Sequence, residues 1–85
     1  MRVQLHRNFV KKYKKFRIIQ KQIDERLALF RIRPFDPILK NHGLSGKYQG
    51  YRSINITGDF RAIYEQINDD AARFIELDTH SNLYK

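Results

Sequence analysis

The chain has 85 residues, a formal net charge of +8 and no cysteine. This length supports one modest hydrophobic core, so we expect a single domain over residues 1–85. The lack of cysteine excludes disulfides and thiolate chemistry, and no run approaches the roughly 20 apolar residues of a membrane span. We therefore expect a cytoplasmic protein, with no membrane partner, whose stability comes from packing.

The positive charge is concentrated at the N-terminal end. Residues 1–33 contain eleven Lys or Arg and two acidic residues, a net charge of +9, whereas residues 34–85 contain six basic and seven acidic residues, a net charge of −1. Such a basic block favours a nucleic-acid or acidic protein partner, because each neutralised phosphate releases counterions. The solvated face of an ordinary helix explains the block equally well.

The first third of the chain has helical periodicity, with apolar residues recurring at spacings of three or four. The pattern over residues 8–32 fits one long helix or a hairpin bent near Arg17, and a small domain buries the stripe more easily as a hairpin. Pro34 and Pro37 end the helical region. The stripe consists of Phe9, Tyr13, Phe16, Ile19, Ile23, Leu27 and Phe30.

Residues 34–50 contain both prolines and three of the four glycines, and we expect a long loop there. Strand-like runs follow at residues 51–56, 60–67 and 72–80, and the turn sequences Thr-Gly-Asp and Asn-Asp-Asp join them. An antiparallel meander is the simplest arrangement. Residues Val3–Leu5 offer a short additional edge strand. The order β-α-α-β-β-β predicts an α+β fold, with a helical pair on one face of a small, mainly antiparallel twisted sheet.

The last strand places ionisable groups together. If Ile75 and Leu77 face the core, the two-residue alternation puts Glu76, Asp78 and His80 on the opposite face. His80 could serve as a proton donor or acceptor, and Asp78 could hold its imidazole charged. On spacing alone, a surface histidine at a strand end is the simpler interpretation.

Other candidates have ordinary explanations when they are taken one at a time. His42 is a loop histidine, Asp59 belongs to a tight turn, and Arg61 could pair with Glu65 or Glu76. Three tyrosines could stack on bases but are also common in sheets, namely Tyr48, Tyr51 and Tyr84. The three histidines are widely separated and match no metal-binding spacing, so we expect neither a metal nor another cofactor.

Together, "NHGLSGKYQGYRSINITGDFRAIYEQI" and "FIELDTHSNLYK" resemble the RelE/ParE superfamily of bacterial type II toxins, most closely its YafQ-like branch. Five elements occur in the family's order: the loop histidine, the Gly-Tyr-Arg strand, the Asp-aromatic-Arg turn, the Ile-Tyr strand and the Thr-His-Ser tail. The resemblance implies a RelE-like microbial ribonuclease fold and cleavage of mRNA in the ribosomal A site. It also implies a cognate antitoxin that forms a hetero-oligomer with the toxin.

The resemblance assigns roles residue by residue. His80 would protonate the leaving 5′-oxygen while the RNA's own 2′-hydroxyl attacks the phosphate, His42 or Asp59 would accept the hydroxyl proton, and Arg61 would stabilise the developing charge. The family's catalytic positions correspond here to His42, Asp59, Arg61, His80 and Tyr84. The expected RNA-binding residues are Lys11, Lys12, Lys14, Lys15, Arg17, Lys47, Arg52 and Arg73.

The sequence departs from the YafQ-like pattern at two positions. Asn55 stands where a histidine is common, and Glu76 stands where an arginine is common. The main alternative is a non-catalytic ParE-like inhibitor of DNA gyrase on the same fold. Such an inhibitor has no need of four polar residues that occur together here, namely His42, Asp59, Arg61 and His80. A small RNA-binding or ribosome-binding module would explain the basic segment but not the C-terminal tail.

Overall fold

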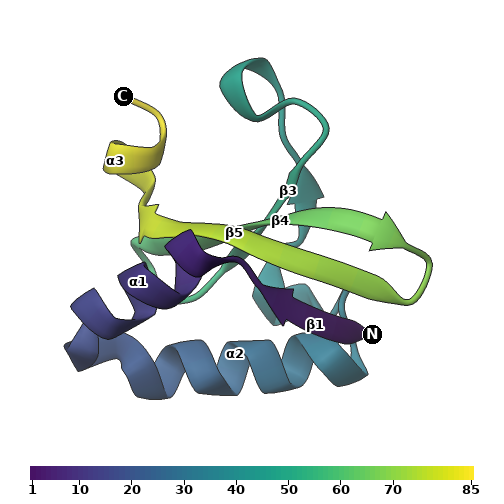
Figure 1. The fold of residues 1–85 in the computed structure, drawn as a ribbon, viewed down its shortest axis with the longest axis horizontal. Coiled ribbons are helices and arrows are strands. Elements are labelled where there is room, and N and C mark those ends of the chain that lie inside the picture. The colour runs from purple at the N-terminus through teal and green to yellow at the C-terminus, as the bar shows by residue number, and fades with distance from the viewer.

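The computed structural model describes residues 1–85 as an α+β fold with α1 and α2 on one side of a five-stranded sheet and α3 on the other (Figure 1). None of its helices has the length and apolar character that crossing a membrane requires. The elements in chain order are β1 (Arg2–Leu5), α1 (Arg7–Lys15), η1 (Arg17–Ile19), α2 (Gln20–Ile32), η2 (Pro37–Leu39), β2 (His42–Gly43), η3 (Gly46–Tyr48), β3 (Arg52–Asn55), β4 (Phe60–Asn68), β5 (Ala71–Thr79) and α3 (His80–Leu83), where η denotes a 3-10 turn.

The N-terminal helices form a hairpin. α1 ends at Lys15, after which Phe16 leaves helical geometry at φ −93° and ψ 61°, and η1 leads into α2. Across the hairpin, Gln20 Nε2 donates to Tyr13 O (2.9 Å) and Tyr13 Oη donates to Asp24 Oδ1 (2.8 Å). The predicted bend near Arg17 is confirmed, because folding back lets both helices bury their apolar faces on one sheet.

The sheet has the strand order β1-β5-β4-β3-β2, in which β1 pairs with β5 in parallel and all other pairs are antiparallel. The predicted meander and edge strand are confirmed. The predicted order omitted β2, which pairs His42 with Ser53 and Gly43 with Arg52 at the opposite edge. Two residues are too short to produce a period-two pattern, so this strand is set by its partner.

The hydrophobic core lies between the helical hairpin and the sheet. Phe30 of α2 packs edge-on against Tyr64 (4.9 Å between ring centroids) and Phe74 (5.1 Å), which joins the two layers. The buried Tyr64 hydroxyl accepts a hydrogen bond from Asn41 Nδ2 (2.7 Å), so its polar end is satisfied. The core consists of Phe9, Ile23, Leu27, Phe30, Leu39, Ile54, Ile56, Ala62, Tyr64, Ala72, Phe74 and Leu77.

A β-bulge changes the facing of β5. Tyr64 pairs with Phe74 but Ile63 pairs with Glu76, so Ile75 is an extra residue in the ladder. Phe74 therefore faces the core, whereas Ile75 lines a surface pocket of about 440 Å³ together with Glu76, separate from the candidate active site described below. The prediction that Ile75 faces the core is wrong, because the bulge interrupts the alternation on which it depended. Glu76 lies on the predicted face.

Residues 34–50 are more ordered than the predicted loop. They contain η2, β2 and η3, and Leu39 is fully buried in the core. Asp36 caps η2 through Oδ1, which accepts a hydrogen bond from Ile38 N (3.0 Å). Elements of two or three residues, held by local caps and a single buried anchor, leave no periodic signal in the sequence.

Candidate active site

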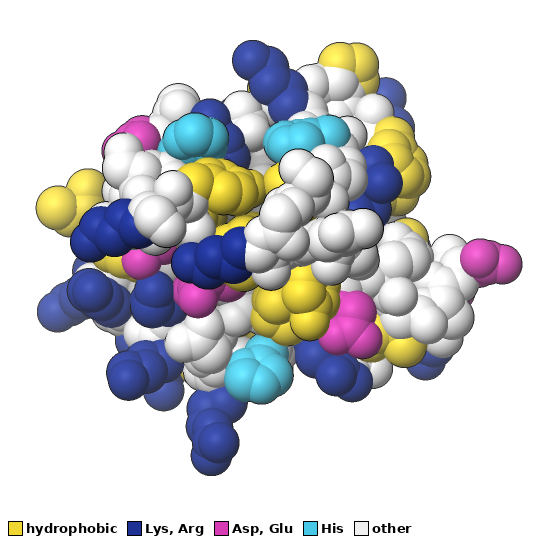
Figure 2. Space-filling model, turned by 90° about the horizontal axis from the view of Figure 1, so that it is seen from above, with side chains coloured by type: hydrophobic (Ala, Val, Ile, Leu, Met, Phe, Trp, Pro, Cys, Tyr) yellow, Lys and Arg dark blue, Asp and Glu magenta, His cyan; other side chains and the backbone are white.

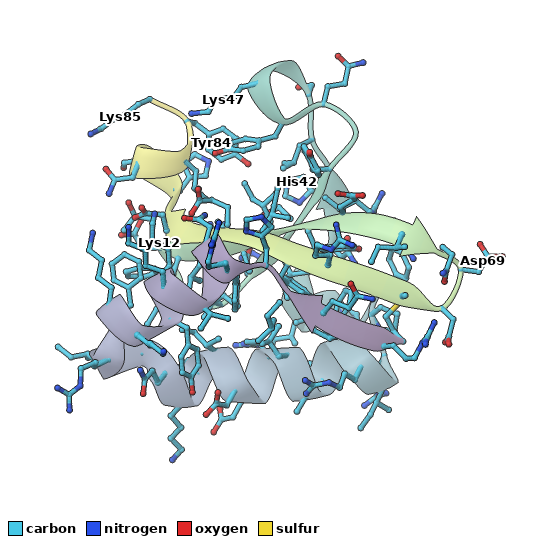
Figure 3. All side chains as sticks on the ribbon, in the orientation of Figure 1. Lys12, His42, Lys47, Asp69, Tyr84 and Lys85 are labelled. Carbon is cyan, nitrogen blue, oxygen red and sulfur yellow. The ribbon has the colours of Figure 1, made fainter.

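A hollow of about 510 Å³ lies on the side of the sheet away from the helical hairpin, where Figure 3 shows its lining residues His42 and Tyr84. Its lining comes from Lys40, residues 42–45, β3, β4 and the C-terminal segment, and includes His42, Arg61, His80 and Tyr84. Asp59, the remaining predicted catalytic residue, is exposed in the β3–β4 turn and does not line the hollow. Figure 2 shows this side of the molecule, on which histidine side chains reach the surface.

Strand pairing brings these distant residues together. His42 of β2 pairs with Ser53 of β3, and Asn55 of β3 pairs with Arg61 of β4. Directly paired residues on neighbouring strands project from the same face, and so do residues two apart on one strand. The four side chains therefore form two adjacent rungs on the face that carries the hollow, and all four line it.

The hydrogen bonding of His42 defines its tautomer. Its Nδ1 lies 2.8 Å from Lys40 O, and because a carbonyl oxygen only accepts hydrogen bonds, Nδ1 must carry a proton. In the neutral ring Nε2 is then unprotonated. Lys40 has a left-handed backbone (φ 48°, ψ 44°) at the end of η2, and this conformation helps to place its carbonyl oxygen beside the His42 ring. His42 is thus prepared to accept a proton at Nε2.

His80 begins α3. The strand ends at Thr79, one residue earlier than predicted, because Thr79 Oγ1 accepts a hydrogen bond from Asn82 N (3.2 Å) and caps the helix. His80 N donates to Asp59 O (2.9 Å), so Asp59 supports this residue through its backbone. Since His80 is exposed and its ring has no hydrogen-bond partner in the chain, the imidazole is available to a ligand.

Tyr84 forms one wall of the hollow. Its ring lies 4.8 Å from the His80 ring and 6.0 Å from the Tyr48 ring, measured between centroids. Figure 3 shows Tyr84 between the C-terminal helix and the loop that bears Lys47. Partial burial raises the pKa of Tyr84, although nearby Arg61 opposes the shift, so the phenol stays protonated at neutral pH and keeps a hydrogen to donate.

Arg61 is anchored by the turn that precedes it. Its Nη1 lies 3.2 Å from the carbonyl oxygens of Thr57 and Gly58, and 3.1 Å from that of Phe60. It forms neither of the two expected pairs with acidic side chains. Nε and Nη2 have no partner in the chain, so a half-buried and anchored guanidinium keeps N–H donors for an anion in the hollow.

A neighbouring ion-pair network connects α1 with β5. Lys12 Nζ lies 2.9 Å from Asp78 Oδ2 and 3.1 Å from Glu76 Oε1 (Figure 3). Partial burial alone would lower the pKa of Lys12, but its hydrogen bonds to the two carboxylates raise it overall. Asp78 therefore bonds to Lys12 and not to His80, and the charge of Glu76 is compensated within the protein.

The predicted RNA-binding residues fall into two groups. One group is exposed and makes no ion pair with another side chain: Lys11, Lys14, Lys15, Arg17 and Lys47. In the other group Lys12 is paired as described, and Arg52 donates to Asn41 Oδ1 (2.9 Å). Arg73 donates to Gln4 Oε1 (3.4 Å) beside a separate hollow of about 440 Å³. The exposed group offers free charge for a nucleic-acid backbone.

Ser53, which was not among the predicted site residues, lines the hollow and is 1% exposed. Its sequence signal was weak. Ser53 is a polar residue that alternates with Ile54 on a short strand, so it shares the strand face of Asn55. No group of three or more His, Asp or Glu side chains is placed to hold a metal ion.

Comparisons with known proteins agree with this geometry. The whole chain, residues 1–85, matches a family model described as "Bacterial toxin of type II toxin-antitoxin system, YafQ". The structure of YafQ from E. coli strain BL21(DE3) is similar with a TM-score of 0.82 and 22% identity, covering 100% of both chains. YafQ in the E. coli DinJ-YafQ complex is similar with a TM-score of 0.80 and 23% identity, again over 100% of both chains. A copper-bound mutant toxin from Helicobacter pylori is similar with a TM-score of 0.78 and 26% identity, over 99% of both chains. A search of curated proteins finds no match.

Proposed function

The chain belongs to the YafQ family of bacterial type II toxins, and we propose that its activity is the endonucleolytic cleavage of mRNA in the ribosomal A site, in the cytoplasm. One observation supports this most directly: His42, Arg61 and His80 line a single hollow. Cleavage by a 2′-hydroxyl requires a proton acceptor, a proton donor and a cation for the phosphate, and these three side chains supply them.

The tautomer of His42 assigns the proton transfers. Nε2 of His42 accepts the proton of the RNA 2′-hydroxyl, whose oxygen attacks the adjacent phosphorus. The bond between phosphorus and the 5′-oxygen breaks as His80 protonates that oxygen, which leaves a 2′,3′-cyclic phosphate and a free 5′-hydroxyl. Arg61 stabilises the charge that develops on the non-bridging oxygens. Asp59, outside the lining, supports His80 through its carbonyl oxygen.

We also propose a cognate antitoxin as the partner, because E. coli YafQ has been solved in complex with DinJ. The exposed cations of α1 suit an acidic segment of such an antitoxin, which would form a hetero-oligomer with this chain. Binding there would compete with RNA for the same charges. Expression of the toxin with its antitoxin should therefore protect the host cell.

The test is a reconstituted translation reaction with a defined mRNA. The protein should cut the mRNA and leave a 2′,3′-cyclic phosphate, and a 2′-deoxy substitution at the nucleotide before the cut should abolish cleavage. Cleavage that persists after the substitution would contradict the proposed mechanism. A protein that leaves mRNA intact but inhibits DNA supercoiling by gyrase would instead be the non-catalytic inhibitor.

A further inference from the structure

Ser53 combines deep burial with an unpaired polar atom. Its side chain is 1% exposed, and its Oγ has no hydrogen-bond partner, the only such buried side-chain atom in the structure. A buried hydroxyl without a partner destabilises a fold, because the hydrogen bonds that it makes with water in the unfolded chain are not replaced. An unsatisfied group of this kind therefore calls for a functional explanation.

The position of Ser53 indicates where its partner would lie. It occupies the middle of the sheet face that carries the hollow, paired with His42 on one side and with Ile63 on the other. Arg61, two residues before Ile63, is its diagonal neighbour on β4. Ser53 thus lies between the proposed proton acceptor and the proposed phosphate-binding cation.

The side chains next to Ser53 already form hydrogen bonds with other groups. His42 Nδ1 bonds to Lys40 O, and Arg61 Nη1 bonds to carbonyl oxygens of its own turn. The groups that remain free are donors from Ser53 and Arg61 together with one acceptor, His42 Nε2. A ligand rich in acceptor oxygens and negatively charged satisfies this set, and a phosphodiester has both properties.

We propose that Ser53 Oγ donates a hydrogen bond to a non-bridging phosphate oxygen of the RNA bound in the hollow, beside Arg61. This inference rests on the proposed nuclease function and adds a substrate contact to it. The hydroxyl keeps its proton and forms no covalent bond. Its effect is to hold the phosphate in place between the two histidines, and RNA binding supplies the partner that the fold does not.

The test is Ser53→Ala, with Ser81→Ala as the matched control, since Ser81 is an exposed serine that does not line the hollow. Ser53→Ala should melt at the same temperature as the wild type or higher, because the deleted hydroxyl has no partner in the fold. Its kcat/KM for mRNA cleavage should fall roughly 10- to 100-fold, the effect of losing one hydrogen bond to a charged group. Ser81→Ala should match the wild type in both measurements. Ser53→Ala with wild-type kcat/KM, or with a clearly lower melting temperature, would overturn the proposal.

A binding measurement separates this proposal from the nuclease function. The probe is a short RNA with a 2′-deoxy substitution at the cleavage position, and its dissociation constant is measured by fluorescence anisotropy. If the wild type binds the probe but cuts no mRNA, the nuclease proposal fails. A larger dissociation constant for Ser53→Ala than for the wild type would still support the phosphate contact. Equal dissociation constants, or no binding by the wild type, would overturn the contact.

Discussion

Lys12 Nζ lies 2.9 Å from Asp78 Oδ2, and this contact ties the helical hairpin to the strand that leads into the candidate active site. The other oxygen of Asp78 accepts hydrogen bonds from Thr79 N (2.8 Å) and Asn82 Nδ2 (3.0 Å), so the same carboxylate holds the first turn of α3. The pair thereby supports the helix that presents His80. Lys12 has a structural role that sets it apart from the exposed lysines around it.

Replacing Lys12 with Met should destabilise the fold by about 1–3 kcal/mol, because Asp78 and Glu76 lose a charged donor in a partly buried setting. Lys11→Met is the matched control on the same helix, and it should change the free energy of unfolding by no more than about 0.5 kcal/mol since Lys11 is exposed. Urea denaturation measures both values. Equal effects of the two substitutions would show that the ion pairs contribute nothing to stability.

The same network predicts how stability depends on pH. Burial alone would raise the pKa of Asp78, but the hydrogen bonds from Lys12, Asn82 and Thr79 N lower it below the ordinary 3.8. A pKa that is lower in the folded state than in the unfolded chain stabilises the fold at pH values above the unfolded pKa. This stabilisation disappears as the pH falls through the folded pKa. The free energy of unfolding should therefore decrease below about pH 4. Asp78→Asn should be less stable at neutral pH and should lose this part of the acid dependence, whereas an identical pH profile would refute the assignment.

The two histidines of the hollow should matter for cleavage more than for stability. His80→Ala and His42→Ala should each slow mRNA cleavage by about 10²–10⁴-fold, the usual contribution of a positioned proton donor or acceptor. Both side chains are exposed, so melting temperatures should change little. The control is His6→Ala, which removes the α1 cap at His6 but lies outside the hollow and should leave the cleavage rate unchanged.

A substitution at Asp59 tests whether its carboxylate or its backbone carbonyl contributes to cleavage. Because only its carbonyl oxygen contacts His80, Asp59→Asn should slow cleavage much less than His42→Ala does. Single-turnover rates on the same mRNA would compare the two substitutions. If Asp59→Asn is as slow as His42→Ala, the carboxylate is the proton acceptor and the roles of the two residues must be exchanged.

The exposed cations of α1 should contribute to RNA affinity through the phosphate backbone. Changing Lys11 and Lys14 to Gln should reduce the salt dependence of ribosome binding, with the slope of log K against log salt falling by about 0.7–0.9 for each phosphate that is no longer neutralised. Lys21 and Arg31, exposed on α2, provide a control pair of equal charge. An unchanged slope in the Lys11 and Lys14 variant would mean that these charges serve solubility.

The elements that were predicted correctly depend on neighbours in the sequence. Phe9 and Ile23 belong to a stripe with helical spacing, and both are fully buried. The hairpin turn before Phe60 and the strand that follows it were likewise readable from turn residues and β-branched residues. The candidate residues of the hollow were named from the order of motifs along the chain, without information on which of them meet.

Contacts between distant segments decided the rest. The bulge at Ile75 arises from the register between two strands, and β2 exists because Ser53 and Arg52 offer it a partner. The pairing of Lys12 with Asp78 spans 66 positions, so no local pattern could separate Lys12 from the free lysines beside it. The sequence alone therefore determined the helical hairpin, most of the sheet and the residue types suited to phosphate chemistry, because periodicity and turn propensity act between near neighbours. Only the tertiary structure decided the facing of β5 and the unpaired hydroxyl of Ser53, because each depends on what an atom meets across the fold.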